Sequence, residues 1–309
     1  MKKTLLTLFA LLIIISIWAE DNQENKEDKI PWIKYEKLSV GTDSSLEVMT
    51  WNIQNFPKHK FTVELAAKII SSINPDVIGL QEMESDEDFY KMLKKLQELE
   101  PNSDWKGYRA TSDSWDQNLA YLYKASVLEN VKIYEIYTDD EKYHLPFPRK
   151  PLVMEFDFNG EDFVIINNHF KARTGKKNED RRRKAVHLIK EYIDTKLPNQ
   201  EVFVLGDMND SITDEADKNV FTEILNDTIN YKFTDLEIAS DPMENWSYPY
   251  WKYRGHLDHI LITNELFDEF SHKNSDIRVI PLDKFTEGGN DGTYKYITDH
   301  RPVILKLAM

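Results

Sequence analysis

The sequence predicts an α/β protein whose polar site lies at the ends of its strands. Short apolar runs that suit buried strands alternate with segments of helical periodicity along the 309-residue chain. The clearest strand is Val202–Leu205, which is followed by Gly206, Asp207 and Asn209. Because Asp207 and Asn209 are two residues apart, they could point to the same side as the chain leaves the strand.

The same combination of apolar and polar residues recurs along the chain. Leu46–Asn52 ends in an amide, Val77–Glu82 in an acid and Phe163–His169 in a histidine. In Leu257–Ile262 and Thr298–Leu305 the order is reversed, and the acid precedes the apolar run. If these two strands run antiparallel to the others, all six polar groups meet at one edge of the sheets.

The remaining elements follow from the spacing of apolar residues. This spacing predicts helices over Thr62–Ile73, Asp86–Leu99 and Ala185–Ile193. It predicts additional strands over Trp105–Ala110, Asn118–Tyr123 and Val131–Tyr137. Short helices and turns are expected from residue 210 to 241, and a Gly-rich loop is expected over Glu287–Tyr294.

One large domain is expected behind a processed N-terminus, because no Pro/Ser/Gly-rich linker divides the chain. Residues 1–19 combine a basic start with an apolar run shorter than a membrane span, which predicts a secretory signal peptide. Residues 20–45 are expected to form a leader, partly disordered because Glu20–Lys29 is charged, and residues 46–309 the domain. The protein would then be secreted or periplasmic; an uncleaved N-terminal anchor is the alternative.

Composition excludes several classes of chemistry. The chain has no Cys, which rules out disulfides, a lipidated Cys anchor, thiolate metal ligands and a Cys nucleophile. Its formal net charge of −15 argues against a protein that coats DNA through bulk charge. It does not exclude a nuclease, because a carboxylate cluster that binds metal is itself acidic.

Six motifs occur along the chain in a fixed order: WNIQNF, LQEM, NNHFKA, GDMND, LDHILIT and TDHRPV. Together they resemble the endonuclease/exonuclease/phosphatase superfamily, which includes deoxyribonuclease I, exonuclease III, neutral sphingomyelinases and inositol polyphosphate 5-phosphatases. The resemblance runs from about Leu46 to Leu307. It implies a four-layer α/β sandwich, in which two mixed β-sheets pack face to face with helices outside.

The resemblance also implies a metal site. Glu82 matches the family's principal metal ligand, and Asn52 and Asp299 are expected beside it, with Asn52 next to the substrate phosphate as well. Such oxygen ligands suit Mg²⁺ or Mn²⁺, with Ca²⁺ as a structural ion. Whether one metal ion or two bind is open.

Five residues match the family's catalytic positions: His169, Asp207, Asn209, Asp258 and His300. The two histidines are expected to contact the phosphate as charge develops. Asp207 would orient or deprotonate water, with Asn209 positioning that water or the phosphate. Asp258 would fix the tautomer of His300, so the base is either Asp207 or the Asp258–His300 pair.

Deoxyribonuclease I pairs its catalytic histidine with a Glu, and this chain departs from that pattern. The corresponding place holds Gln117 or Asn118, which leaves the protonation of His169 open.

Two basic residues are expected to bind substrate. Arg149 stands where family members often carry an Arg that reaches phosphate, although a plain surface Arg, or Lys150 in its role, is the alternative. Lys171 opens a segment, 171–184, that holds eight basic residues. That segment suits contact with a phosphate backbone or, as the alternative, a solvated helix start.

These observations favour an exported, metal-dependent endonuclease that acts on DNA, or on RNA. The equivalents of the inositol phosphatase motifs differ here, and no clear apolar hairpin of the kind that sphingomyelinases insert into membranes is evident. The alternatives are a sphingomyelinase-like or other phosphoester hydrolase and a non-catalytic binding protein, against which the full set of acids and histidines argues. We expect a monomer with nucleic acid as its partner, no stable protein partner and no transmembrane span in the mature chain.

Overall fold

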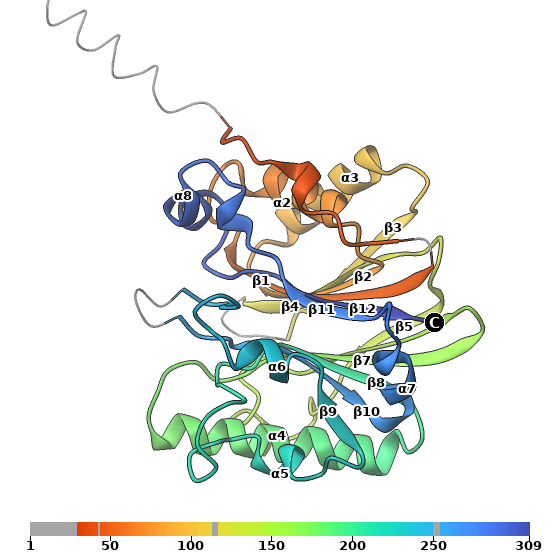
Figure 1. Ribbon diagram of the computed structural model, residues 1–309, viewed down its shortest axis with the longest axis vertical. Helices are drawn as coiled ribbons and strands as arrows, with labels where there is room; N and C mark the ends of the chain where they lie inside the picture. Colours follow the sequence, from red (N-terminus) through yellow and green to blue (C-terminus); the bar gives the residue numbers. More distant parts are fainter. Residues whose placement is uncertain (1–29, 43, 113–116, 250–253) are drawn as a thin grey trace, which may run out of the picture. The chain divides into compact units, whose positions relative to one another are not determined.

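The computed structural model describes residues 30–42, 44–112, 117–249 and 254–309 (Figure 1). The predicted signal peptide and the leader up to residue 29 lie outside these residues. One compact unit runs from Ile33 to Met309. Within that unit Ile33 and Leu38 are already buried, and Ile33 bridges to Thr286, so the chain joins the core before the first long strand.

Two six-stranded sheets form the centre of this unit. The first has the order β11-β12-β1-β2-β4-β3. Its strands are β1 Ser45–Phe56, β2 Val77–Met83, β3 Trp105–Arg109, β4 Asn118–Lys124, β11 Asp276–Val279 and β12 Val303–Ala308. The second has the order β5-β6-β7-β8-β10-β9. Its strands are β5 Glu129–Glu135, β6 Leu152–Phe158, β7 Glu161–His169, β8 Glu201–Asp207, β9 Tyr231–Phe233 and β10 Asp258–Thr263.

Helices cover the outer faces of the sheets. The α-helices are α2 Thr62–Ile73, α3 Asp86–Leu99, α4 Lys176–Lys196, α5 Thr222–Leu225, α6 Leu236–Ala239, α7 Phe267–Ser271 and α8 Gly289–Tyr296. Short 3-10 turns occupy Tyr35–Lys37, Glu141–Tyr143, Asn264–Leu266 and Leu282–Lys284. Figure 1 shows α2 and α3 outside the first sheet, and α4 and α5 outside the second, with the sheets facing each other. This confirms the predicted four-layer α/β sandwich.

Three apolar clusters hold the layers together. One packs α2 and α3 on the first sheet, with Trp51 and Phe89 among its largest side chains. A second packs α4 on the other sheet, and the third fills the space between the sheets, where Phe163 and Phe203 stack. The strands between two apolar layers are buried on both faces, which is why they appear in the sequence as continuous apolar runs.

The strand directions bring the polar ends together as expected. β1 and β2 are parallel, as are β7 and β8, so their carboxyl ends lie on the same edge of their sheets. β12 is antiparallel to β1 and β10 is antiparallel to β8, so the residues that precede β12 and begin β10 lie at that same edge. Asp258 is paired directly with Asp207.

The segment Glu287–Tyr294 differs from the expected Gly-rich loop, because most of it is the helix α8. Its glycines suggested a helix breaker, but Gly292 is required by close packing: a Cβ there would meet Glu287 O at 1.9 Å. Thr293 is buried within α8, and Ile297 is buried directly after it. Tertiary packing therefore overrides the low helix propensity of glycine.

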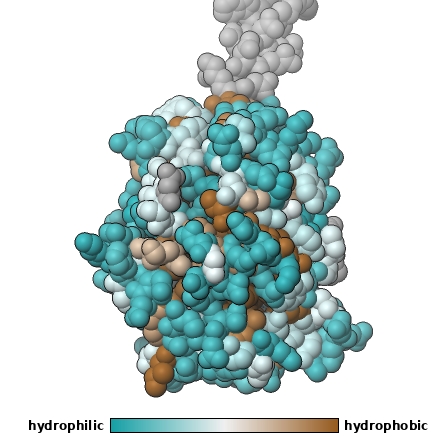
Figure 2. Space-filling model, turned by 90° about the vertical axis from the view of Figure 1, so that its right-hand side faces the viewer, coloured by the Kyte–Doolittle hydropathy of each residue, from teal (hydrophilic) through white to brown (hydrophobic). Residues whose placement is uncertain are grey.

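No helix in the described part of the chain is long and apolar enough to cross a membrane. The face shown in Figure 2 carries mostly hydrophilic residues with hydrophobic ones interspersed, which is ordinary for a surface in contact with water.

Candidate active site

The backbone at the end of β8 places Asp207 at the edge where the polar residues meet. Gly206 has φ +136°, and a Cβ at this position would lie 1.9 Å from Asn168 O on the neighbouring strand. Only glycine fits this combination of conformation and close approach. The glycine of the GDMND motif thus lets β8 approach β7 and present Asp207 beside His169, its register partner.

Two buried amides connect the sheets beneath the site. Gln81 Nε2 donates a hydrogen bond to Asn167 Oδ1 at 2.8 Å. Asn167 Nδ2 in turn donates to the carbonyl oxygens of Leu80 and Ala120, each at 3.1 Å. Gln81 precedes Glu82 and Asn167 lies two residues before His169, so this bridge fixes the strands that carry both site residues.

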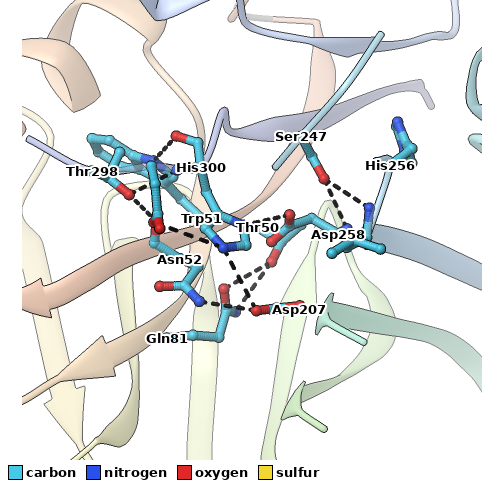
Figure 3. Close-up of polar contacts among 12 residues, drawn as sticks. Thr50, Trp51, Asn52, Gln81, Asp207, Ser247, His256, Asp258, Thr298 and His300 are labelled. Atoms are coloured by element: carbon cyan, nitrogen blue, oxygen red, sulfur yellow. Dashed lines mark hydrogen bonds and ion pairs between the residues drawn. The ribbon is translucent and has the colours of Figure 1, made fainter. Parts of the chain in front are cut away.

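Asn52 links the two central carboxylates. Its Nδ2 donates to Glu82 Oε1 at 3.2 Å and to Asp207 Oδ2 at 3.0 Å, and its Oδ1 accepts a hydrogen bond from Gln54 N at 2.9 Å. Figure 3 shows Asn52 directed at Asp207. In this orientation Asn52 is a donor that holds Glu82 and Asp207 together, and its role as a metal ligand stays a prediction.

Asp299 approaches the same place from the loop before β12. Its Oδ2 accepts a hydrogen bond from Gln54 Nε2 at 2.7 Å, while its Oδ1 is buried without a hydrogen-bond partner in the described part of the protein. Burial raises the pKa of Asp299, and the neighbouring Glu82 raises it further. Asp299 Oδ1, whose nearest cationic atom is His300 Nε2 at 3.9 Å, is therefore available to bind a further ligand.

Asp258 and His300 form the predicted pair. His300 Nδ1 lies 2.8 Å from Asp258 Oδ2, which directs Nε2 towards Asp207 Oδ2 at 3.8 Å (Figure 3). Burial lowers the pKa of His300, but the charges of Asp258, Asp207 and Asp299 outweigh burial and raise it to about 10. The ring is thus an imidazolium at neutral pH.

Asp207 lies between the two histidines. Its Oδ2 is 3.5 Å from His169 Nε2 and 3.8 Å from His300 Nε2. Burial, followed by the charge of Asp258, raises the pKa of Asp207 to about 7, which is suited to a group that accepts a proton at neutral pH.

The surroundings of His169 bear on its protonation, which the sequence left open. Its Nδ1 is buried and has no hydrogen-bond partner within the part of the chain that the structure describes. Burial lowers the pKa of His169 well below its usual value, and the charges of Arg149, His300 and Lys171 lower it further. His169 is therefore a neutral ring beside Asp207, in contrast to His300.

Asn209 closes the end of β8. Its backbone N–H donates to Asp207 Oδ1 at 3.0 Å, and its Nδ2 donates to Phe170 O at 3.2 Å. These bonds hold the carboxylate of Asp207 and fix the GDMND turn to the end of β7. The positive φ of 53° suits an Asn.

The basic residues on the side of the second sheet divide into two groups. Arg149, which donates to Gln117 Oε1, and Lys171 lie near enough to His169 for their charges to lower its pKa. Arg182, in contrast, is buried and donates to Asp210 Oδ2 at 2.8 Å and to Lys171 O at 2.7 Å. Within the basic segment 171–184, Arg182 therefore stabilises the fold, whereas Lys171 is a cation beside the site.

Two supporting hydroxyl groups had no role assigned from the sequence. Thr298 Oγ1 donates to Asn52 O at 2.8 Å and accepts from His300 N at 3.0 Å, so it connects the two sides of the site. Ser247 Oγ accepts from Leu257 N at 2.9 Å and from Asp258 N at 3.1 Å (Figure 3). Hydroxyl groups that bond to backbone of distant segments are not visible in a one-dimensional pattern.

A buried His–Asp–His cluster was also missed. Asp235 Oδ2 lies 2.9 Å from His256 Nε2 and 2.6 Å from His259 Nδ1. The other ring nitrogens face backbone oxygens, His256 Nδ1 at Asn245 O (2.6 Å) and His259 Nε2 at Asp210 O (2.9 Å). The cluster joins β10 to the segments that hold Asp210, Asp235 and Asn245.

The carboxylates fit a divalent cation. Glu82, Asp207 and Asp299 offer oxygen ligands, the type that Mg²⁺ prefers, and Asp299 Oδ1 accepts no hydrogen bond among the described residues. The raised pKa values of Asp207 and Asp299 reflect burial and mutual repulsion, which a bound cation would relieve. Asp207, Asp258 and His300 also bring ligand-type atoms within 4.8 Å of one another.

The sequence profile of the Endonuclease/Exonuclease/phosphatase family matches residues 46–299. The chain therefore belongs to this family of hydrolases, whose enzymes use divalent metals. No curated protein matches the chain.

Solved structures share the fold at low sequence identity. An endonuclease/exonuclease/phosphatase family protein from Leptotrichia buccalis C-1013-b has a TM-score of 0.62 and 14% identity, covering 85% of this chain and 100% of its own. D. rerio TDP2 complexed with single strand DNA product has a TM-score of 0.59 and 15% identity, covering 86% of this chain and 100% of its own. The human Nocturnin catalytic domain with bound sulfate anion has a TM-score of 0.57 and 18% identity, covering 85% of this chain and 93% of its own.

Proposed function

We propose that this protein is an exported, divalent-metal-dependent phosphodiesterase that acts as an endonuclease on DNA. The observation that carries the proposal is the convergence of His169 and the Asp258–His300 pair on Asp207. Glu82 and Asn52 join the same group of side chains. Family membership supports phosphoester hydrolysis, and the DNA product bound to D. rerio TDP2 supports a nucleic acid substrate.

Glu82 and Asp299, with Asn52 alongside, would hold Mg²⁺, or Mn²⁺ in its place. The bound cation would supply positive charge to a phosphate oxygen and to the leaving group. Ca²⁺ as a structural ion is a separate expectation from the sequence.

Asp207 would orient the attacking water and accept its proton, because burial makes its carboxylate a stronger base than an exposed one. His300, an imidazolium held by Asp258, would donate a hydrogen bond to a phosphate oxygen on which charge develops. The neutral His169 would contribute a second donor from Nε2. This assignment prefers Asp207 over the Asp258–His300 pair as the base, because a protonated His300 cannot accept a proton.

The cations beside His169 favour a polyanionic substrate. Arg149 and Lys171 lie on the side of the second sheet, where they could contact phosphates next to the one that is cleaved. Such contacts are expected to strengthen binding with little dependence on base sequence. A monomer with no stable protein partner would suffice for this reaction.

The test is hydrolysis by the purified protein of plasmid DNA, RNA, sphingomyelin and inositol phosphates in parallel, each with Mg²⁺. We expect nicking of the plasmid that EDTA abolishes and added Mg²⁺ restores. Glu82→Gln should need a higher Mg²⁺ concentration, because one metal ligand has lost its charge. Cleavage of sphingomyelin with intact plasmid would support the sphingomyelinase-like alternative. Absence of all hydrolysis would support a binding protein.

Export is proposed from the sequence of residues 1–19, which lie outside the described part of the structure. We expect the mature N-terminus near Glu20, in the culture medium or the periplasm. N-terminal sequencing of the protein from these fractions and from membranes tests this. Recovery of intact Met1 in the membrane fraction would support the uncleaved anchor instead.

A further inference from the structure

Lys58 brings a positive charge to the carboxylate cluster from the loop between β1 and α2. Its Nζ donates a hydrogen bond to Gln54 Oε1 and lies 3.4 Å from the centroid of the Tyr294 ring. Both contacts are made by an ammonium group, since Gln54 Oε1 only accepts hydrogen bonds and the aromatic face attracts a cation. The charge is therefore held in place by partners from two different elements, β1 and α8.

Gln54 connects this ammonium to the predicted metal ligands. The same side chain that accepts from Lys58 donates through Nε2 to Asp299 Oδ2 at 2.7 Å. The negative charges of Asp299 and Glu82 act on Lys58 and oppose the fall in its pKa that burial causes. Lys58 is thus close enough to both carboxylates to neutralise part of their charge.

We infer that Lys58 is a built-in counter-cation that competes electrostatically with the divalent metal at Glu82 and Asp299 and thereby sets its affinity. The inference rests on the proposed function, because it takes these two carboxylates as metal ligands. A positive charge fixed near the ligands disfavours a second one, and the repulsion in a partly buried site is larger than in bulk water. Removing the charge of Lys58 should therefore tighten metal binding. If Lys58 instead supported catalysis or the metal site, its removal would leave metal affinity unchanged or make it weaker.

Tyr294 gives this arrangement its geometry. Its ring belongs to α8, the helix that the sequence suggested would be a loop, and the Lys58 ammonium lies over its face. In Tyr294→Leu the charge of Lys58 remains but its aromatic partner is lost. We expect an intermediate increase in metal affinity, because the ammonium can then move away from the carboxylates.

The experiment is isothermal titration calorimetry, which measures the affinity of the metal-free full-length protein for Mg²⁺ and, in a second series, for Mn²⁺. Lys58→Gln is expected to bind either ion more tightly than the wild type, by about fivefold or more at low ionic strength. Lys58→Arg keeps the charge and should stay near the wild-type affinity. Lys60→Gln is the matched control, two residues along the same loop, where Lys60 lies over the Phe61 ring instead.

The outcomes separate this inference from the proposed function. If the wild type binds metal and Lys58→Gln binds it equally or less tightly, the role of Lys58 is wrong and the metal site stands. If the wild type binds neither ion, the proposed metal-dependent function fails, and with it the basis of the inference. Circular dichroism and thermal melting of each variant identify a change in folding that would otherwise alter affinity.

Discussion

His300→Ala is expected to lower kcat/KM for phosphodiester hydrolysis by about a thousandfold, the upper end of what removing one transition-state donor costs. Asp258→Asn should cause a loss of about the same size or greater, because an amide can no longer hold the Nδ1–H tautomer or stabilise the imidazolium. The structural basis is the 2.8 Å contact between His300 Nδ1 and Asp258 Oδ2, both of which are buried.

His169→Ala should also lose about a hundredfold to a thousandfold, because it removes the second donor beside Asp207. The double variant of His169 and His300 should lose less than the product of the single losses, since both rings serve one transition state. His187→Ala is the control, because His187 is an exposed histidine that pairs with Glu223 on the surface. The measurement is initial rate on a phosphodiester substrate across a Mg²⁺ series, with circular dichroism as the fold control.

Near-wild-type rates for both single histidine variants would show that the site is assigned wrongly, although the fold and the family would stand. A loss that high Mg²⁺ fully restores would place the histidines in metal binding instead. The expected result is a loss in kcat at every Mg²⁺ concentration, because these side chains act on the phosphate.

Asp235→Asn is expected to lower the free energy of unfolding by about 3–5 kcal/mol, as does the loss of one partner from a buried charge pair. Asp235 Oδ2 contacts His256 and His259, and Oδ1 accepts a hydrogen bond from Ile260 N at 3.1 Å. All four ring nitrogens of the two histidines face oxygen acceptors, so the rings need more N–H groups than two neutral imidazoles possess. The carboxylate stabilises the extra positive charge that this geometry requires.

The stabilisation by Asp235 should depend on pH in a defined direction. Burial raises the pKa of Asp235, but the two histidines outweigh burial and lower that pKa below its ordinary 3.8. The stabilisation by ionised Asp235 is therefore present above pH 3.8 and lost as pH falls through the pKa in the folded protein. Burial lowers the pKa of His259, yet Asp235 outweighs burial and raises that pKa above 6.5. The stabilisation by protonated His259 is therefore complete below pH 6.5 and declines as pH rises through the pKa in the folded protein. The difference between wild type and Asp235→Asn should therefore be largest between about pH 4 and 6.5.

Urea unfolding of both proteins at pH 5.5, 7 and 9 measures that difference. Asp276→Asn serves as the matched control, because Asp276 is partly exposed and pairs with Arg278 near the surface. Its effect should stay within about 1 kcal/mol, the range of exposed ion pairs. A difference below 1 kcal/mol for Asp235→Asn at every pH would show that the cluster does not carry the charge inferred from its geometry.

The fold was predictable because burial leaves a direct trace in the sequence. Strands such as β8 lie between two apolar layers and appear as apolar runs, and the helices α2 and α3 were predicted with the bounds that they have in the structure. The error at Glu287–Tyr294 arose because glycine has low helix propensity, whereas the burial of Thr293 and Ile297 that holds α8 in place is a tertiary effect. Local propensity cannot report a contact between residues whose approach the fold itself creates.

By itself, the sequence determined which side chains end or begin the central strands, because each polar residue follows or precedes a buried run at a fixed position in the chain. It therefore predicted the family, which the profile match shows, and the candidate site residues Asn52, Glu82, His169, Asp207, Asn209, Asp258, Asp299 and His300. Only the tertiary structure decided the protonation of these groups. The pKa of a buried side chain depends on its distances to charges that are far away in sequence. Nearby carboxylates raise the pKa of His300, burial and nearby cations lower the pKa of His169, and the charges of Asp299 and Glu82 act on Lys58.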